Sequence, residues 1–265
     1  PMAVPRISAA MKTSALPAAP RTQPQGLLTS SAYPIFFMPL EPSVKRVFAF
    51  VDGQNLFRSV KTAFGYPYPN YDVKALAEKV CAQSGWNLAR ACFYTGVPTV
   101  TDDLFWHHFW TAKCAQMGRE GVYTYTRDLR YRNQTVQVPG FGTYAFLAGQ
   151  EKGIDVRIAL EITSLAYKRA YDVAVIFSQD QDLSEVAKEV RDIAVSQGRW
   201  IKLVCAFPDS PTVINRRGVN GTDWFRFDRA FYDACIDGRD YRPKPVGPPV
   251  PPRPVGSSGG SGAAP

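Results

Sequence analysis

The stretch that decides the fold runs from residue 173 to residue 183 and has the sequence VAVIFSQDQDL. Its first five residues are apolar and rich in β-branched side chains, which predicts a buried parallel strand. The strand pattern stops at Ser178, and two carboxylates, Asp180 and Asp182, follow it. Residues 183–197 are expected to form a helix that ends before Gly198. Carboxylates at the carboxyl end of a central strand lie where open α/β sheets bind their ligands.

The rest of the chain alternates between strand and helix patterns on both sides of this stretch. Further strands are expected at residues 46–51, 88–94, 122–127 and 200–207, and helices at 73–83, 103–117 and 156–170. The glycine-containing segment 128–150 is expected to be irregular. This alternation predicts a three-layer α/β/α, Rossmann-like fold with a mostly parallel central sheet of about five strands. If the first and fourth strands are neighbours, Asp52 and Asp180 face each other at their carboxyl ends.

Composition indicates the cellular compartment and argues against some classes of protein. Five cysteines show no CxxC spacing, and most lie in expected helices or strands, so we expect reduced core thiols in a cytoplasmic protein. Only two histidines are present, and they are adjacent, which argues against a structural zinc site. No apolar segment is long enough to span a membrane, so no membrane association is expected.

The two ends of the chain differ in composition from the body. Residues 1–43 are rich in Ala, Ser, Thr and Pro, which predicts a disordered tail of native or foreign origin, although a transit peptide has a similar composition. Residues 241–265 are rich in Pro and then in Gly and Ser, which predicts a flexible tail that could recruit a protein partner. The folded domain is therefore expected over residues 44–240. The net charge of the chain is +8, of which the two tails contribute +5 and the body +3. The charge of the body alone therefore does not indicate a nucleic-acid-binding protein.

Four carboxylates fall at or just beyond the ends of expected elements. They are Asp52, Asp155, Asp180 and Asp182. Mg²⁺ and Mn²⁺ prefer such oxygen ligands, and a bound ion can activate water and stabilise charge on a phosphodiester. The nearby Lys152 and Arg157 could hold phosphate oxygens.

Each carboxylate also has a purely structural interpretation. Asp182 precedes a helix with Glu185 three residues on, which is a capping-box arrangement. Asp155 could cap the helix that follows it, and Asp52 could simply form a turn. Asp180 has no such role in the pattern, because Asp182 already supplies a cap, so the metal-site hypothesis depends most on Asp180.

A mixed aromatic and basic segment follows the third expected strand. It contains Tyr123, Tyr125, Arg127, Arg130, Tyr131 and Arg132. Single-stranded RNA is bound by such mixtures, with arginine on phosphate and rings on bases. Because alternate strand residues point into a core, Tyr123 and Tyr125 are expected to be structural. Arg127, Arg130 and Arg132 remain as candidate RNA contacts.

Three motifs in the same order resemble the NYN family of PIN-like nucleases, in its bacterial LabA-like branch. They are FVDGQN at residues 50–55, EKGIDVR at 151–157 and FSQDQDL at 177–183, within a similarity that extends over roughly 46–240. The resemblance implies a PIN-like fold and a divalent-metal-dependent ribonuclease whose ligands are the four carboxylates. It also implies supporting roles for Asn55 and Ser178, and a tendency to form homo-oligomers. Many relatives have SGDSDF at 178–183, so the larger Gln179 and Gln181 here could narrow access or change substrate choice.

Three functions follow from these observations. The favoured one is an endoribonuclease that uses Mg²⁺ or Mn²⁺ and an acidic cluster to hydrolyse single-stranded or structured RNA. The second is an RNA- or protein-binding module with weak or no nuclease activity. The third, a phosphatase or receiver-type phosphoryl-transfer protein, is disfavoured, because the position two residues after Asp52 is Gln54 rather than a second aspartate.

Overall fold

A pair of parallel strands, β1 (Arg46–Asp52) and β6 (Val173–Phe177), forms the centre of the fold. In the computed structural model, which describes residues 39–150 and 152–243, every residue of β6 is buried. Val51 lies opposite Phe177 in the register of the two strands. The predicted neighbours are therefore adjacent, and both end at the same edge of the sheet. The predicted tails lie almost entirely outside the described residues.

Four further strands complete a six-stranded sheet in the order β3-β2-β1-β6-β7-β8. They are β2 (Asn87–Val97), β3 (Tyr123–Asp128), β7 (Lys202–Pro208) and β8 (Asp223–Phe227). Every neighbouring pair is parallel, which confirms the predicted α/β class. The prediction of about five strands missed β8, because this edge strand is largely exposed and lacks a continuous apolar run.

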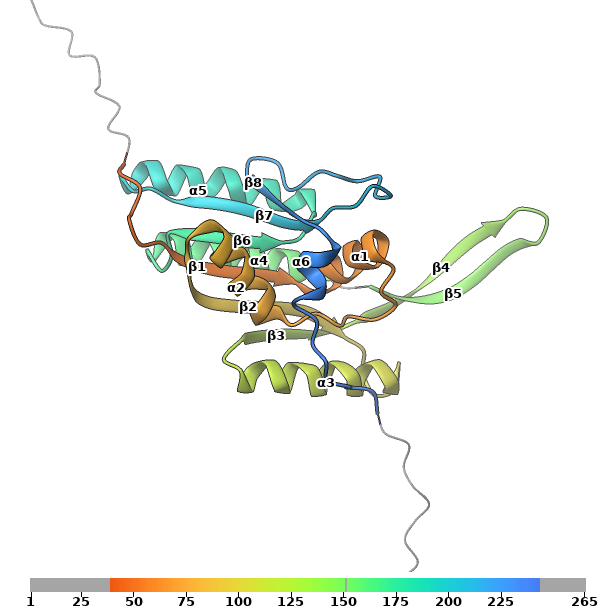
Figure 1. Ribbon diagram of the computed structural model, residues 1–265. Helices are drawn as coiled ribbons and strands as arrows, with labels where there is room; N and C mark the ends of the chain where they lie inside the picture. Colours follow the sequence, from red (N-terminus) through yellow and green to blue (C-terminus); the bar gives the residue numbers. More distant parts are fainter. Residues whose placement is uncertain (1–38, 151, 244–265) are drawn as a thin grey trace, which may run out of the picture. The chain divides into compact units, whose positions relative to one another are not determined.

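Helices cover both faces of the sheet (Figure 1). They are α1 (Gly53–Phe64), α2 (Val73–Ser84), α3 (Leu104–Arg119), α4 (Ile154–Tyr167), α5 (Ser184–Ser196) and α6 (Arg229–Asp233). Val51 packs in the core under α1, α2, α3 and α6, whereas Phe50 packs on the opposite face under α4 and α5. Alternate residues of β1 thus serve two cores, as expected for a buried parallel strand. None of the described helices is both long and apolar enough to cross a membrane.

Aspartates begin the helices on one face. Asp72 and Asp103 each accept a hydrogen bond from a backbone N–H three residues on, and so begin α2 and α3. Gly85 then ends α2 in the left-handed conformation. Helix α1 was not predicted. It begins at Gly53, directly after β1, with no loop between them. The residues of its first turn therefore resemble those of an ordinary turn, and the helix was missed.

The segment expected to be irregular is a β-hairpin. Strands β4 (Arg130–Val138) and β5 (Gly142–Gln150) pair antiparallel as a two-stranded sheet of their own, which leaves the carboxyl end of β3 as an arm (Figure 1). The prediction was wrong because side chains on successive residues 133–136 are exposed. A ribbon with water on both faces needs no alternation of apolar and polar residues, so it gives no strand signal.

Candidate active site

Asp52 lies at the end of β1 and is also the N-cap of α1. Its side chain is only 6 % exposed, and its Oδ1 accepts a hydrogen bond of 2.9 Å from the backbone N–H of Asn55. The Ser178 hydroxyl, from the end of β6, donates to Asp52 Oδ2 at 3.5 Å. Strand β1, helix α1 and the end of β6 therefore converge on one carboxylate.

The next residue, Gly53, lets the chain turn from strand into helix while packing closely against β2. A Cβ there would lie 2.5 Å from the Phe93 ring and 3.1 Å from the Tyr94 carbonyl oxygen. The Gly53 carbonyl in turn accepts a hydrogen bond of 2.9 Å from the buried Tyr71 hydroxyl. Any larger side chain at position 53 would displace the turn that carries Asp52.

Asp180 is placed by a short 3₁₀ turn, η1 (Gln181–Leu183), between β6 and α5. The backbone N–H of Asp180 donates to Ser178 Oγ at 3.2 Å, and Asp180 Oδ1 accepts from the N–H of Asp182 at 3.0 Å. Asp180 is therefore half-buried and held at both its backbone and its carboxylate.

This turn corrects the predicted capping box. Asp182 does not cap the following helix: α5 begins after Leu183 with no side-chain cap, and Asp182 is exposed within η1. The cap is Asp180, the residue that had no structural role in the sequence pattern. The reason is that the 3₁₀ turn precedes the α-helix and needs its cap at an earlier position.

The electrostatics of the site favour a cation. Burial raises the pKa of Asp52 to about 6; the hydrogen bond from Asn55 opposes this shift, and the Asp180 charge adds to it. Arg58 lowers this pKa, but its charge does not offset the burial. The Asp180 charge thus acts on a carboxylate that is almost cut off from water, which is unfavourable unless a positive charge joins them.

Asn55 couples the two halves of the site. Its Oδ1 accepts a hydrogen bond of 2.9 Å from the backbone N–H of Gln179, while its own N–H donates to Asp52. The side chain thus joins the first turn of α1 to the segment that carries Asp180. Asn55 and Ser178 both lie beside the carboxylates, as the resemblance implied.

Asp155 and Asp182 do not extend the pair into a ready-made cluster. Within residues 39–150 and 152–243, no group of three or more His, Cys, Asp or Glu side chains is placed to hold one ion. Asp155 lies inside the first turn of α4, where a carboxylate is favourable to the helix dipole. The N-cap of α4 is Gly153, whose φ of 77° is in the left-handed region, and the helix begins at Ile154, so Asp155 does not cap it and that structural alternative is wrong.

A donor set of two carboxylates and a hydroxyl still fits Mg²⁺ or Mn²⁺. Mg²⁺ commonly binds through one or two carboxylates and takes its other oxygens from water and substrate phosphates. Asp52, Asp180 and Ser178 provide such a set at one edge of the sheet. The strong burial of Asp52, without a side-chain cation bonded to it among the described residues, is the observation in favour of this fit.

Gln179 and Gln181 hold a loop beside the site, and no sequence pattern predicted the position of this loop. Gln179 Nε2 donates to the carbonyl oxygens of Arg217 at 2.9 Å and Asn215 at 3.3 Å. Gln181 Nε2 donates to the Gly218 carbonyl at 3.1 Å, and its Oε1 accepts from the N–H of Asn220 at 3.2 Å. The two glutamines therefore hold residues 215–220 against the segment that carries Asp180 and Asp182.

Both arginines of this loop, Arg216 and Arg217, are exposed, but they differ in their partners. Arg216 is engaged with Asp209 through bonds of 2.8 and 3.2 Å. Among the described residues, the Arg217 guanidinium makes only a long contact of 3.5 Å, to Asn220. The guanidinium of Arg217 is thus available to a ligand.

The predicted basic contacts differ in whether their side chains already have partners in the fold. Arg127 donates to the carbonyl oxygens of Lys152 and Gly153 at 3.2 and 3.4 Å. Arg157 pairs with Glu161 at 3.1 Å and lies over the ring of Tyr125. The remaining set comprises Arg130 and Lys152, which are exposed, and Arg132, whose strand position is described but whose side chain lies outside the described residues.

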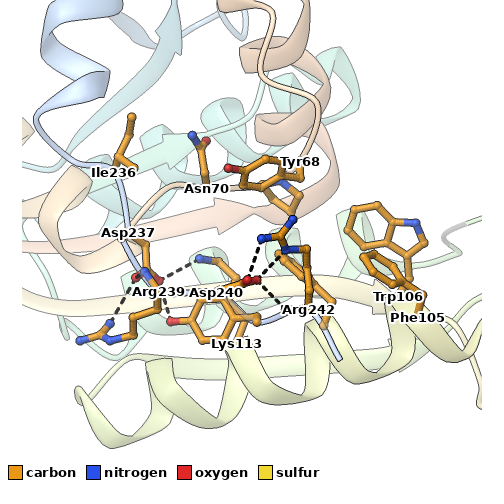
Figure 2. A pocket seen from close by; sticks show the side chains of 14 residues that line it. Tyr68, Asn70, Phe105, Trp106, Lys113, Ile236, Asp237, Arg239, Asp240 and Arg242 are labelled. Atoms are coloured by element: carbon orange, nitrogen blue, oxygen red, sulfur yellow. Dashed lines mark hydrogen bonds and ion pairs between the residues drawn. The ribbon is translucent and has the colours of Figure 1, made fainter. Parts of the chain in front are cut away.

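A pocket of about 400 Å³ lies elsewhere, between α3 and the segment after α6 (Figure 2). Its interior is set by the buried Lys113, which bonds to the Tyr71 carbonyl at 2.9 Å and to Asp237 at 3.2 Å. None of the residues predicted for the active site lines it. This pocket is therefore distinct from the carboxylate pair.

Residues 46–196 match the NYN domain family. The chain belongs to this family. The matched range contains β1, α4, β6 and η1, and hence all four predicted carboxylates. The six-stranded parallel sheet is the PIN-like fold expected of an NYN domain. Assignment to the LabA-like branch stays a prediction.

Solved structures similar to this NYN domain are distant. A protein of unknown function from Vibrio parahaemolyticus is 16% identical, with a TM-score of 0.41 over 72% of this chain and 99% of that one. MurG from Acinetobacter baumannii is 13% identical, with a TM-score of 0.27 over 69% of this chain and 45% of that one. No curated protein matches the chain.

Proposed function

We propose that this NYN domain is an endoribonuclease that hydrolyses RNA phosphodiester bonds with Mg²⁺ or Mn²⁺ at the Asp52–Asp180 edge of the sheet. The observation that carries the proposal is the burial of Asp52, whose carboxylate is held by α1 and β6 with the Asp180 charge beside it. A stable fold has little reason to bury a carboxylate beside another one. A site that binds a divalent cation has such a reason, because the cation balances the two negative charges.

The chain would hold the ion through Asp52 and Asp180. Asp155 and Asp182, which the described structure does not gather into one group with that pair, would be more distant acidic ligands. When bound, the ion supplies a more acidic water molecule and neutralises charge at the scissile phosphate. Asn55 and Ser178 keep the two carboxylates in place through the bonds that they make to Asp52 and to the 178–180 segment.

Basic side chains would bind the phosphates of the RNA on either side of the cleaved bond. The predicted contacts are Lys152, Arg127, Arg130, Arg132 and Arg157. Arg217 joins them, since the two glutamines place its loop beside Asp180 and Asp182. Self-association of the domain and recruitment of a protein by residues 241–265 stay predictions, which light scattering and binding to the isolated tail peptide would test.

The decisive variant is Asp180→Asn, assayed on a mixed RNA pool with Mn²⁺ and again with chelator. We expect the parent to cut only with metal, and the variant to lose at least about a hundredfold in rate, because the neutral amide is a poor ligand for a hard cation. Asparagine keeps an oxygen that can accept the bond from the N–H of Asp182, so the circular dichroism spectrum should not change.

Asp192→Asn is the matched control, since Asp192 is an exposed carboxylate on α5 remote from these bonds. It should cut RNA at the parent rate. Equal cleavage by Asp180→Asn and the parent would overturn the proposed site.

A second function deserves a test because only two of the four acids are brought into one site among the described residues. An RNA-binding module without nuclease activity would bind RNA equally well with and without metal. Calorimetric titration of Mn²⁺ into the protein, alone and with RNA, separates the two functions. Tighter metal binding in the presence of RNA favours the nuclease, and metal-independent RNA affinity with no cleavage products favours the module.

A further inference from the structure

A second hollow adjoins the carboxylates through the first turn of α1. It is a cavity of about 230 Å³ between α1, the start of α3 and the base of the β4–β5 hairpin. We call it the aromatic pocket and define it by Gln54, Phe57, Asp103, Trp106, Trp110 and Tyr131. Gln54 is two residues beyond Asp52, so the aromatic pocket and the candidate active site share the first turn of α1.

The pocket walls suit a flat ligand. Phe57, Trp106 and Tyr131 are half-buried, so part of each ring is open to a ligand, and Trp110 is buried behind them. Trp106 is fixed by edge-to-face contact with Phe109, with ring centroids 5.2 Å apart. Because these rings are already ordered by packing, a planar group can stack on them at little entropic cost.

Polar groups at the pocket favour a neutral ligand with hydrogen-bonding edges. Asp103 Oδ1 accepts from the N–H of Trp106 at 3.0 Å, and no hydrogen bond to its Oδ2 is made by the described residues. The Gln54 amide likewise forms no hydrogen bond within the described part of the chain, and it can both donate and accept. Burial, together with the charges of Asp102 and Asp103, raises the pKa of Tyr131, which places negative charge close to that ring.

The acidic charge selects between the parts of an RNA chain. A phosphate would be repelled by Asp103, whereas a nucleobase is flat, uncharged and edged with donors and acceptors. At about 230 Å³ the cavity is smaller than the pockets that enclose drug-sized ligands, so it takes one ring system. Bases that carry an exocyclic amino group can donate to the second oxygen of Asp103, and uracil has no such group.

We propose that the aromatic pocket binds one unpaired, amino-bearing nucleobase of the RNA beside the scissile phosphate. This inference rests on the proposed function, since it assumes that RNA occupies the neighbouring carboxylate edge. It assigns the protein a preference for single-stranded RNA, because a base must leave its helical stack to enter the pocket.

The test measures binding of fluorescent oligonucleotides to the full chain in chelator, where RNA stays uncut. The three probes are oligocytidylate, oligouridylate and a sugar–phosphate chain of the same length without bases. We expect the parent to bind oligocytidylate best and the abasic chain worst. Trp106→Ala and Tyr131→Ala should weaken oligocytidylate binding at least about fivefold and leave the abasic chain unaffected, since stacking is lost and phosphate contacts are not.

Three further variants separate stacking from folding and from specificity. Trp106→Phe and Tyr131→Phe keep an aromatic ring and should retain most of the affinity. Asp103→Asn keeps an acceptor for the cap of α3 but should lower the preference for oligocytidylate over oligouridylate. Tyr144→Ala removes an exposed hairpin ring that does not line the pocket and should behave as the parent.

Losses that are equal for oligocytidylate and the abasic chain, or no loss at all, would overturn the pocket assignment. The cleavage comparison of Asp180→Asn with the parent does not depend on these variants, so the proposed function would survive that result. A parent protein that neither binds nor cuts any RNA would instead remove both proposals.

Discussion

Asp52 is the residue whose environment works against folding. Its carboxylate is buried beside another acid, and the burial raises its pKa to about 6. The folded state therefore binds a proton more tightly than the unfolded chain, in which the pKa is near 4. In metal-free protein, the contribution of Asp52 to stability is most favourable below pH 4 and is lost as the pH rises through 6.

Asp52→Asn should therefore stabilise the metal-free protein at high pH. The amide keeps an oxygen for the N–H of Asn55 but carries no charge, so we expect the free energy of unfolding to rise by up to about 3 kcal/mol at pH 8. The gain should vanish at pH 4, where the parent carboxylate is protonated. Thermal unfolding in chelator at both pH values measures the difference, and a variant less stable than the parent at pH 8 would contradict the pKa shift.

Asp180 and Asp182 illustrate what a motif can and cannot specify. The sequence correctly placed two acids at the end of β6, since the buried run 173–177 fixes the strand and its end. It could not tell which acid caps the following turn, because an aspartate serves a 3₁₀ turn and an α-helix equally well. Only the backbone path showed that Asp180 holds the cap and that Asp182 is exposed.

At the level of elements, prediction succeeded for strands that are buried and failed for strands that are exposed to solvent. Strands β1, β2 and β6 were found because parallel strands buried on both faces need continuous apolar residues. The β4–β5 hairpin and the exposed edge strand β8 lack that requirement, so nothing in their pattern separates them from loops. The aromatic pocket was missed for a related reason, since its walls come from α1, α3 and β4, whose contact depends on tertiary packing.

The loop at residues 215–220 is an element whose position depends on two side chains. We expect the double substitution Gln179→Ala, Gln181→Ala to release it, because four hydrogen bonds to its backbone are lost. The amide proton of Asn220 should exchange several-fold faster, and RNA affinity should fall as Arg217 loses its position beside the site. The sheet itself should remain intact.

Hydrogen exchange by mass spectrometry and RNA titration measure the two effects together. Gln83→Ala, at an exposed position on α2, is the matched control and should change neither. Unchanged exchange and affinity in the double variant would mean that the loop holds its place without the glutamines.

The charge of the whole molecule is uneven, and this unevenness shapes how RNA would bind. The net charge is +8, but most of the excess belongs to the two tails rather than to the folded body. Within the body, Arg130 is the first residue of β4 and Lys152 follows β5, so these two exposed side chains lie at the base of the hairpin. Arg130 is near the aromatic pocket, and Lys152 is near the start of α4. Affinity for RNA should therefore depend on a few local phosphate contacts rather than on a broad basic surface.

Salt dependence tests this view of the surface. For single-stranded RNA, the logarithm of the association constant should fall with the logarithm of salt concentration, with a slope of about −0.7 for each phosphate contacted. Arg130→Ala and Lys152→Ala should each reduce the magnitude of that slope by about 0.7 to 1. Lys188→Ala, an exposed lysine on α5, removes the same charge from a surface that the proposal leaves free of RNA and should keep the parent slope. If all three variants changed the slope equally, RNA would be held by net charge alone, and the hairpin base would lose its role as the phosphate-binding edge.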